Sequence, residues 1–159
     1  MKKIRKYLWF VPAIVWMIVI FQFSGQVGTV SSGVSLKVTE GIVTVIEKFR
    51  QGDEADEENL VTRLHPYVRK AAHMTEYAVL FVLLFLSFIF STVATRSAAI
   101  SIVISFVYSC SDEIHQRFVS NRSGQWTDVC IDMTGVLFAV ALVLFIYSGW
   151  QLRKGRKKL

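Results

Sequence analysis

The stretch AVLFVLLFLSFIF at residues 78–90 contains no charged side chain, and it decides the class of fold. It neither alternates apolar with polar residues, as a half-buried strand does, nor confines its apolar residues to one helical face. Three other runs of this kind are present. We therefore predict four membrane-spanning helices at about residues 7–24, 68–92, 97–116 and 125–150, each close to the length that a bilayer requires. The predicted fold is an all-α membrane protein, a four-transmembrane-helix bundle in a single domain over residues 1–159.

The charged residues are grouped in blocks between these runs. The chain has 53% hydrophobic and 19% charged residues and a net charge of +6. Basic residues precede the first run at Lys2, Lys3, Arg5 and Lys6, and others follow the last at Arg153, Lys154, Arg156, Lys157 and Lys158. Such flanks are typical of topology signals beside anionic lipid. No basic stripe interleaved with aromatic residues is present, so we expect membrane lipid as a partner and no nucleic acid.

The distribution of Lys and Arg predicts the orientation of the chain in the cell membrane. Basic termini, with Arg96 in the second loop, place the N- and C-termini in the cytoplasm of a multi-pass protein. The first run lacks a clear cleavage pattern, so we interpret it as a retained span rather than a signal peptide. In the first outer loop, residues 25–67, apolar side chains recur at helical spacing. They predict an extracytoplasmic amphipathic helix followed by the linker GDEADEEN at 52–59. Pro66 would then stand in the first turn of the second span.

Ionisable residues extend the third span. Its apolar part, residues 98–110, rises only about 20 Å as a helix, against roughly 30 Å for the hydrocarbon core. The helix should therefore continue through Asp112, Glu113, His115 and Gln116, with these side chains facing protein rather than lipid. Cys110 and Cys130 follow no metal-binding or redox spacing, and we interpret them as packing residues.

The predicted topology brings further polar residues to the same outer face. The second span begins there with Arg69, Lys70, His73, Glu76 and Tyr77; the fourth begins there with Asp128 and Asp132; the first ends there with Ser24 and Gln26. Such groups can act as structural pairs or snorkel to the interface. Because so many converge, we favour a functional pocket in the outer leaflet.

Several motifs carry a resemblance to a known family. They are FSGQ at 23–26, RKAAHMTEY at 69–77 and DEIHQRF at 112–118, followed in order by Arg122, Asp128 and Gly135. This set resembles the VanZ-like family of small membrane proteins. The resemblance implies a multispan protein of the cell envelope associated with resistance to teicoplanin-type glycopeptide antibiotics. The sequence departs from the family pattern in two places: Gly25 stands where Ser or Asn is common, and Ser120–Asn121 where Pro-Gly is usual.

The polar cluster supports an enzyme as the first hypothesis, acting on an anionic envelope or lipid-linked substrate. His73 with Glu76, and Asp112 with His115, are three residues apart and resemble a base with its orienting carboxylate; Glu113 completes the catalytic candidates. Arginine and lysine side chains suit a phosphate or carboxylate. The substrate-binding candidates are Ser24, Gln26, Arg69, Lys70, Tyr77, Gln116, Arg117, Arg122, Asp128 and Asp132. Alternatively, a divalent metal cofactor could be held by His73, Glu76, Glu113 and His115, although no HExxH motif is present.

Two other functions use the same residues. In a non-catalytic binder, the pocket would hold an anionic lipid headgroup or a lipid-linked cell-wall precursor. In an ion or proton pathway, the intramembrane acids and histidines would form a relay. We consider the pathway the weakest hypothesis, because the cytoplasmic halves of the predicted helices are apolar and offer no continuation of such a relay.

Overall fold

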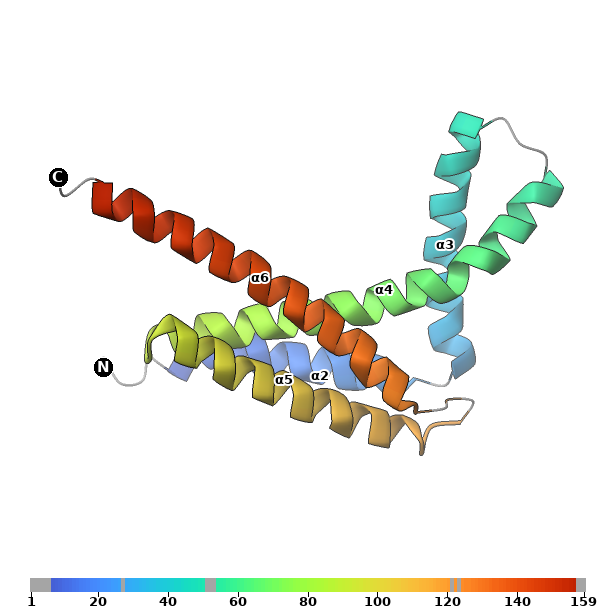
Figure 1. Cartoon of the computed structure of the whole chain (residues 1–159). Coiled ribbons are helices and arrows are strands. Elements are labelled where there is room, and N and C mark those ends of the chain that lie inside the picture. The colour runs from blue at the N-terminus through green and yellow to red at the C-terminus, as the bar shows by residue number, and fades with distance from the viewer. Residues whose placement is uncertain (1–6, 27, 51–53, 121, 123, 157–159) are drawn as a thin grey trace.

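The computed structural model describes residues 7–26, 28–50, 54–120, 122 and 124–156 (Figure 1). The basic residues Lys2, Lys3, Arg5, Lys6, Lys157 and Lys158 lie outside the described residues. The described chain contains helices and turns but no strand. Its elements are η1 (Leu8–Phe10), α2 (Val11–Ser24), α3 (Gly28–Arg50), α4 (Glu54–Ile89), α5 (Ala94–Gln116) and α6 (Trp126–Arg156). The predicted all-α class is confirmed.

Three helices are long and apolar enough to cross a membrane: the part of α4 over Glu58–Ile89, all of α5, and the part of α6 over Trp126–Trp150. The first apolar run, Leu8–Ser24, is shorter. Together η1 and α2 extend about 25 Å, slightly less than the roughly 30 Å of a hydrocarbon core. The chain therefore has three helices that are long and apolar enough to span a membrane and one shorter apolar helix, which is consistent with a membrane protein.

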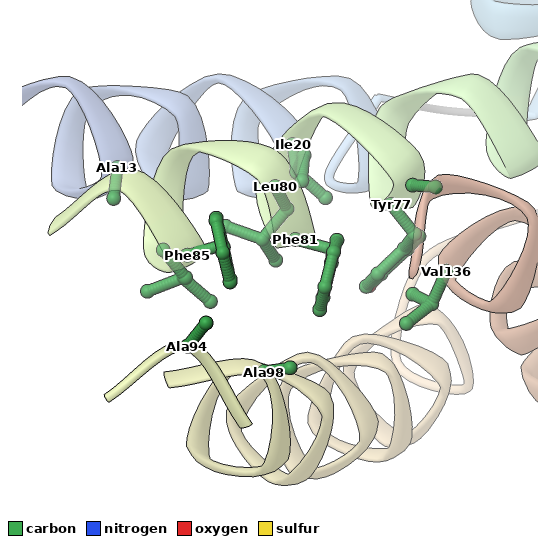
Figure 2. Packing of buried hydrophobic residues seen from close by; sticks show 11 residues of the cluster. Ala13, Ile20, Tyr77, Leu80, Phe81, Phe85, Ala94, Ala98 and Val136 are labelled. Carbon is green, nitrogen blue, oxygen red and sulfur yellow. The ribbon is translucent and has the colours of Figure 1, made fainter. Parts of the chain in front are cut away.

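The bundle is formed by α2, α5, α6 and the second half of α4 (Figure 1). The start of α2, the α4–α5 connection and the end of α6 lie at one end of this bundle, and the end of α2, the end of α5 and the start of α6 lie at the other. Figure 2 shows Leu80, Phe81 and Phe85 of α4 between the neighbouring helices. Because α4 supplies the largest buried side chains, it is the central helix of the core.

A glycine determines how closely α6 approaches α4. A Cβ atom at Gly135 would collide with the backbone carbonyl of Met74. Only glycine permits this contact, and small residues generally allow helix backbones to approach closely in membranes. The crossing places Asp132, one turn before Gly135, against the part of α4 that carries His73.

The structure corrects the predicted start of the second span. We expected it near Val68, with Pro66 in its first turn and a linker before it. Instead, α4 is one helix from Glu54, and Pro66 is inside it. Most of the predicted linker is therefore helical. Proline removes a backbone donor from a helix interior. Packing against α3 supports this part of α4, because Ser35 and His65 form a hydrogen bond of 2.8 Å.

The other boundaries lie closer to the predictions. The third span begins at Ala94 rather than at residue 97, which places Arg96 in the first turn of α5 and not in a loop. The fourth continues through Arg156. As predicted, α5 is helical through Gln116, with Asp112, Glu113 and Gln116 buried against protein.

The predicted helix in the first loop corresponds to α3, which runs across the direction of α2 and α5 (Figure 1). Thr39 and Val43 are completely buried, on the side that bears Ser35, where α3 meets α4. Several apolar side chains of α3 are exposed, among them Val34, Val38, Ile42 and Val45. Thus α3 has one face against protein and a separate apolar face that the chain leaves uncovered.

Candidate functional site

A pocket of about 200 Å³ lies where α3 and α4 meet the end of α2 and the α5–α6 connection. Residues from all four regions line it, which explains why no single motif defines it. The lining residues are Phe23, Ser24, Gln26, Val34, Ser35, Val38, Val68, Arg69, Ala72, His73, Glu76 and Arg122. Six of the predicted site residues, Ser24, Gln26, Arg69, His73, Glu76 and Arg122, are therefore brought together around one space.

Arg122 connects the α5–α6 loop to the end of α2. Its Nη2 donates to the carbonyl oxygen of Phe23 at 3.2 Å, and its Nη1 donates weakly to Oε1 of Gln116 at 3.4 Å. Burial lowers the pKa of the Arg122 guanidinium, whereas the nearby carboxylate of Asp112 raises it. Arginine nevertheless remains protonated in proteins, so Arg122 supplies a permanent positive charge to the pocket.

The charge of the pocket lining is predominantly positive. Arg69 and Arg122 face a single lining carboxylate, Glu76. In the described part of the chain, the salt bridges within 4.0 Å all involve His73, and neither arginine takes part in one. The Nε atom of Arg122 is buried without a hydrogen-bond partner among the described residues. Two guanidinium groups therefore retain donors for an anion.

His73 lies at the junction between the pocket and the carboxylates behind it. Its Nδ1 atom is 3.9 Å from Oε2 of Glu76 and 3.9 Å from Oδ1 of Asp132. These distances are too long for direct hydrogen bonds. The predicted partner Glu76 is thus near His73, and Asp132 is a second carboxylate at the same distance that the sequence did not pair with it.

Three buried carboxylates lie behind the pocket rather than in its lining. Asp132, only 1% exposed, accepts a hydrogen bond of 2.7 Å from Ser109. Asp112 accepts one of 3.1 Å from Nε2 of Gln116, and Glu113 accepts one of 2.8 Å from the backbone N–H of Gln125. Each of these three carboxylates also has a buried oxygen with no hydrogen-bond partner among the described residues. Asp132 joins α6 to α5, Glu113 joins α5 to the connection that follows it, and the three carboxylates together make the region behind His73 acidic.

Three predicted site residues point elsewhere. Lys70 lines a separate surface depression with Thr62, Arg63, Pro66 and Tyr67. His115 stacks on Phe21, with ring centroids 4.5 Å apart. Tyr77 is completely buried in the core of the bundle.

These positions change the predictions for the Asp112–His115 pair and for Lys70. Because His115 faces α2, the proposed pairing with Asp112 is not formed, and the carboxylate of Asp112 is bonded to Gln116 instead. Lys70 and Arg69 are adjacent in sequence, so a helix necessarily directs them to different sides, and Arg69 alone reaches the pocket. Asp128 and Arg117, in α6 and the preceding connection, are also absent from the pocket lining.

The proposed metal-binding set is not assembled. Among the described residues, no group of three or more His, Cys, Asp or Glu side chains is arranged to hold a metal ion. The stacking of His115 on Phe21 removes one of the four predicted ligands from the set. The arrangement therefore does not fit a metal centre built from these residues.

The sequence interpretation missed a column of serines on the buried face of α5. Ser97, Ser101, Ser105 and Ser109 are all completely buried. Their spacing of four residues is the signal that identifies one helix face. Small residues at this spacing allow close packing of helices in a membrane. The buried face of α5 is therefore less uniformly apolar than the argument against an ion pathway assumed.

Hydrogen bonds that fix α2 against the bundle were also missed. The indole Nε1 of Trp16 donates to the backbone oxygen of Glu76 at 2.9 Å. The hydroxyl of Tyr108 donates to the backbone oxygen of Met17 at 2.6 Å. Both interactions end on backbone carbonyls, which the sequence pattern does not reveal. They position the end of α2, and with it Ser24, beside the pocket.

The order of these features along the chain matches one protein family. The profile of the VanZ/LLP1 family matches residues 9–147, which covers α2 to most of α6. The chain belongs to the VanZ/LLP1 family. Comparisons with curated proteins and with solved structures gave no match. The family assignment confirms the resemblance seen in the sequence, and every residue that lines the pocket lies within the matched region.

Proposed function

We propose that this VanZ/LLP1 protein binds an anionic group, a phosphate or carboxylate of a cell-envelope or lipid-linked molecule, in the pocket between Arg69 and Arg122. The observation that carries the proposal is that both arginines line the same space without a carboxylate partner in the described chain. A guanidinium offers planar paired donors to such anions. Ser24, whose buried Oγ has no partner among the described residues, would add a further donor.

The proposal includes an orientation in the cell membrane. Four helices would span it, η1 with α2 serving as the short one, with both termini cytoplasmic. The pocket is lined by residues at the end of α2. It would then lie in the outer leaflet, because the end of α2 is at the opposite end of the bundle from its start (Figure 1). In this arrangement α3, which runs across the bundle direction, would lie along the outer membrane surface with its apolar face towards lipid.

The direct test is binding of phosphate-bearing probes to the full chain in phosphatidylcholine nanodiscs. Glycerol 3-phosphate and dioctanoyl phosphatidic acid would be titrated by calorimetry. We expect Arg122→Gln and Arg69→Gln each to weaken binding by about ten- to a hundredfold, the range for hydrogen bonds to charged groups. Lys70→Gln is the matched control, because it removes a neighbouring charge that does not line the pocket. Equal losses in all three variants, or none, would contradict the proposal.

Catalysis at His73 is the second candidate function. It is favoured by the two carboxylates at 3.9 Å from Nδ1, since either could orient the imidazole after a small shift. In an enzyme, His73→Gln would abolish turnover of a phosphate-bearing lipid while leaving its affinity within about threefold, because the arginines remain. In a binder, the same variant would change only affinity. A turnover assay and a titration on the same preparation separate the two functions.

The association with glycopeptide resistance that the family resemblance implies belongs to the same proposal. Occupancy of the pocket would alter what a teicoplanin-type antibiotic reaches at the outer leaflet. Susceptibility to teicoplanin should therefore be measured in a host that expresses the chain or its Arg122→Gln variant. Protection that persists in the variant at equal expression would separate resistance from anion binding.

A further inference from the structure

The pocket opens onto a strip of aliphatic side chains on α3. Val34 and Val38 line the same pocket as Arg69 and Arg122. The strip continues through Ile42 and Val45, and the four side chains are 41–58% exposed. At 100° per residue they lie within about 80° of one another around the helix. Exposed apolar groups that adjoin a binding pocket in this way indicate an interaction surface.

The strip is distinct from the face that packs on α4. Ser35, Thr39 and Val43, which lie on the α4 side, are at least half-buried, whereas Lys37 and Glu40 are exposed on the remaining side. From Val34 to Val45 the helix rises about 16 Å. The chain thus leaves an apolar strip of that length open. The strip begins at a pocket lined by two guanidinium groups that have no carboxylate partner among the described residues.

We infer that the pocket takes an anionic amphiphile, with its phosphate on Arg69 and Arg122 and one acyl chain along Val34, Val38, Ile42 and Val45. This inference rests on the proposed anion site and specifies its ligand as a lipid rather than a soluble phosphate. Charge at one end and an apolar strip leading away from it match the two parts of such a molecule. The ligand would enter laterally from the outer leaflet, because α3 crosses the end of the bundle there.

The test uses a photoreactive phosphatidic acid with a diazirine in its acyl chain. The full chain is reconstituted in phosphatidylcholine vesicles with a small fraction of this probe, and adducts are mapped by peptide mass spectrometry. A phosphatidylcholine probe with the same chain measures contact with bulk lipid. We expect at least about fivefold more adducts on residues 38–45 from the phosphatidic acid probe than from the control. Glycerol 3-phosphate in excess should reduce this labelling.

Two variants distinguish the strip from the rest of α3. Val38→Asn places a polar group in the strip and should remove most of the excess labelling. Leu36→Asn is the matched control, because Leu36 is also an exposed apolar residue of α3 but lies about 160° from Val38 at 100° per residue. It should leave the labelling unchanged.

Failure of this inference and failure of the proposed anion site give different results. Equal labelling of α3 by the two probes would show that α3 contacts bulk lipid only, and it would overturn the inference even if glycerol 3-phosphate binds. If Arg122→Gln fails to weaken glycerol 3-phosphate binding, the anion site itself is wrong. Excess labelling that persists in Val38→Asn would mean that the apolar side chains of the strip do not hold the acyl chain, and it would also contradict the inference.

Discussion

Ser109 of α5 donates a hydrogen bond of 2.7 Å to the carboxylate of Asp132 of α6, and both side chains are almost completely buried. This pair joins the two helices that frame the pocket from behind. Asp132 also faces His73 of α4 at 3.9 Å. The carboxylate of Asp132 in α6 therefore contacts both α5 and α4, and one of its two neighbours, His73, lines the candidate site.

We expect Ser109→Ala to destabilise the protein by about 1–3 kcal/mol, since it leaves a buried carboxylate oxygen unpaired. Thermal unfolding in detergent, compared with Ser101→Ala, measures the effect. Ser101 is equally buried, but its hydroxyl has no partner among the described residues. Its replacement should therefore change stability much less. Similar losses in both variants would mean that the hydrogen bond to Asp132 is not the source of the stability that Ser109 provides.

The contact between α4 and α6 gives a second prediction. Gly135→Ala places a methyl group against the backbone of Met74, and overpacking of this kind typically costs about 1–3 kcal/mol or more. Gly149→Ala, in the same helix, is the control because a Cβ there meets nothing within 4 Å. We expect a lower melting temperature for the first variant and an unchanged or raised one for the second. A Gly135→Ala protein with the melting temperature of the wild type would contradict the close approach.

The sequence was sufficient to predict the helical class, the approximate bounds of the apolar helices and the burial of Asp112, Glu113 and Gln116. These follow from hydropathy and from the short apolar part of α5, which depend on local sequence alone. The predicted start of the second span was wrong, because Pro66 and the acidic segment are local signals for a helix boundary. Contact with α3, which those signals do not contain, supports the continuous helix.

The candidate site was predictable as a set of residues but not as an arrangement. Arg69, His73, Glu76 and Arg122 lie at the same end of the bundle. The sequence predicts this, because successive antiparallel helices bring these segments to the same end. Which way each side chain points depends on the rotation of every helix. That rotation is set by contacts such as Gly135 against Met74 and Trp16 with the backbone of Glu76. For this reason the sequence could not separate Lys70 and His115 from the residues of the pocket.

The proposed orientation predicts from which side of the membrane a reagent can label a cysteine introduced at an exposed position. In a Cys110→Ser, Cys130→Ser background, single cysteines would replace Lys48 of α3 or Lys154 of α6, both of which are exposed. An impermeant maleimide should label position 48 in intact cells and position 154 only after permeabilisation. Labelling of both positions in permeabilised cells verifies that each is reactive. The reverse pattern would place the pocket at the cytoplasmic face.

His115 provides the sharpest test of which polar residues are functional. Because its ring stacks on Phe21 at 4.5 Å, we expect His115→Phe to retain both stability and binding of glycerol 3-phosphate. His115→Ala should lower stability by about 0.5–1.5 kcal/mol or more, the contribution of an aromatic pair together with lost packing. Thermal unfolding and calorimetry on both variants measure these effects. If His115→Phe folds normally but no longer binds the probe, the imidazole acts in the site itself, and His115 belongs with His73 among its functional residues.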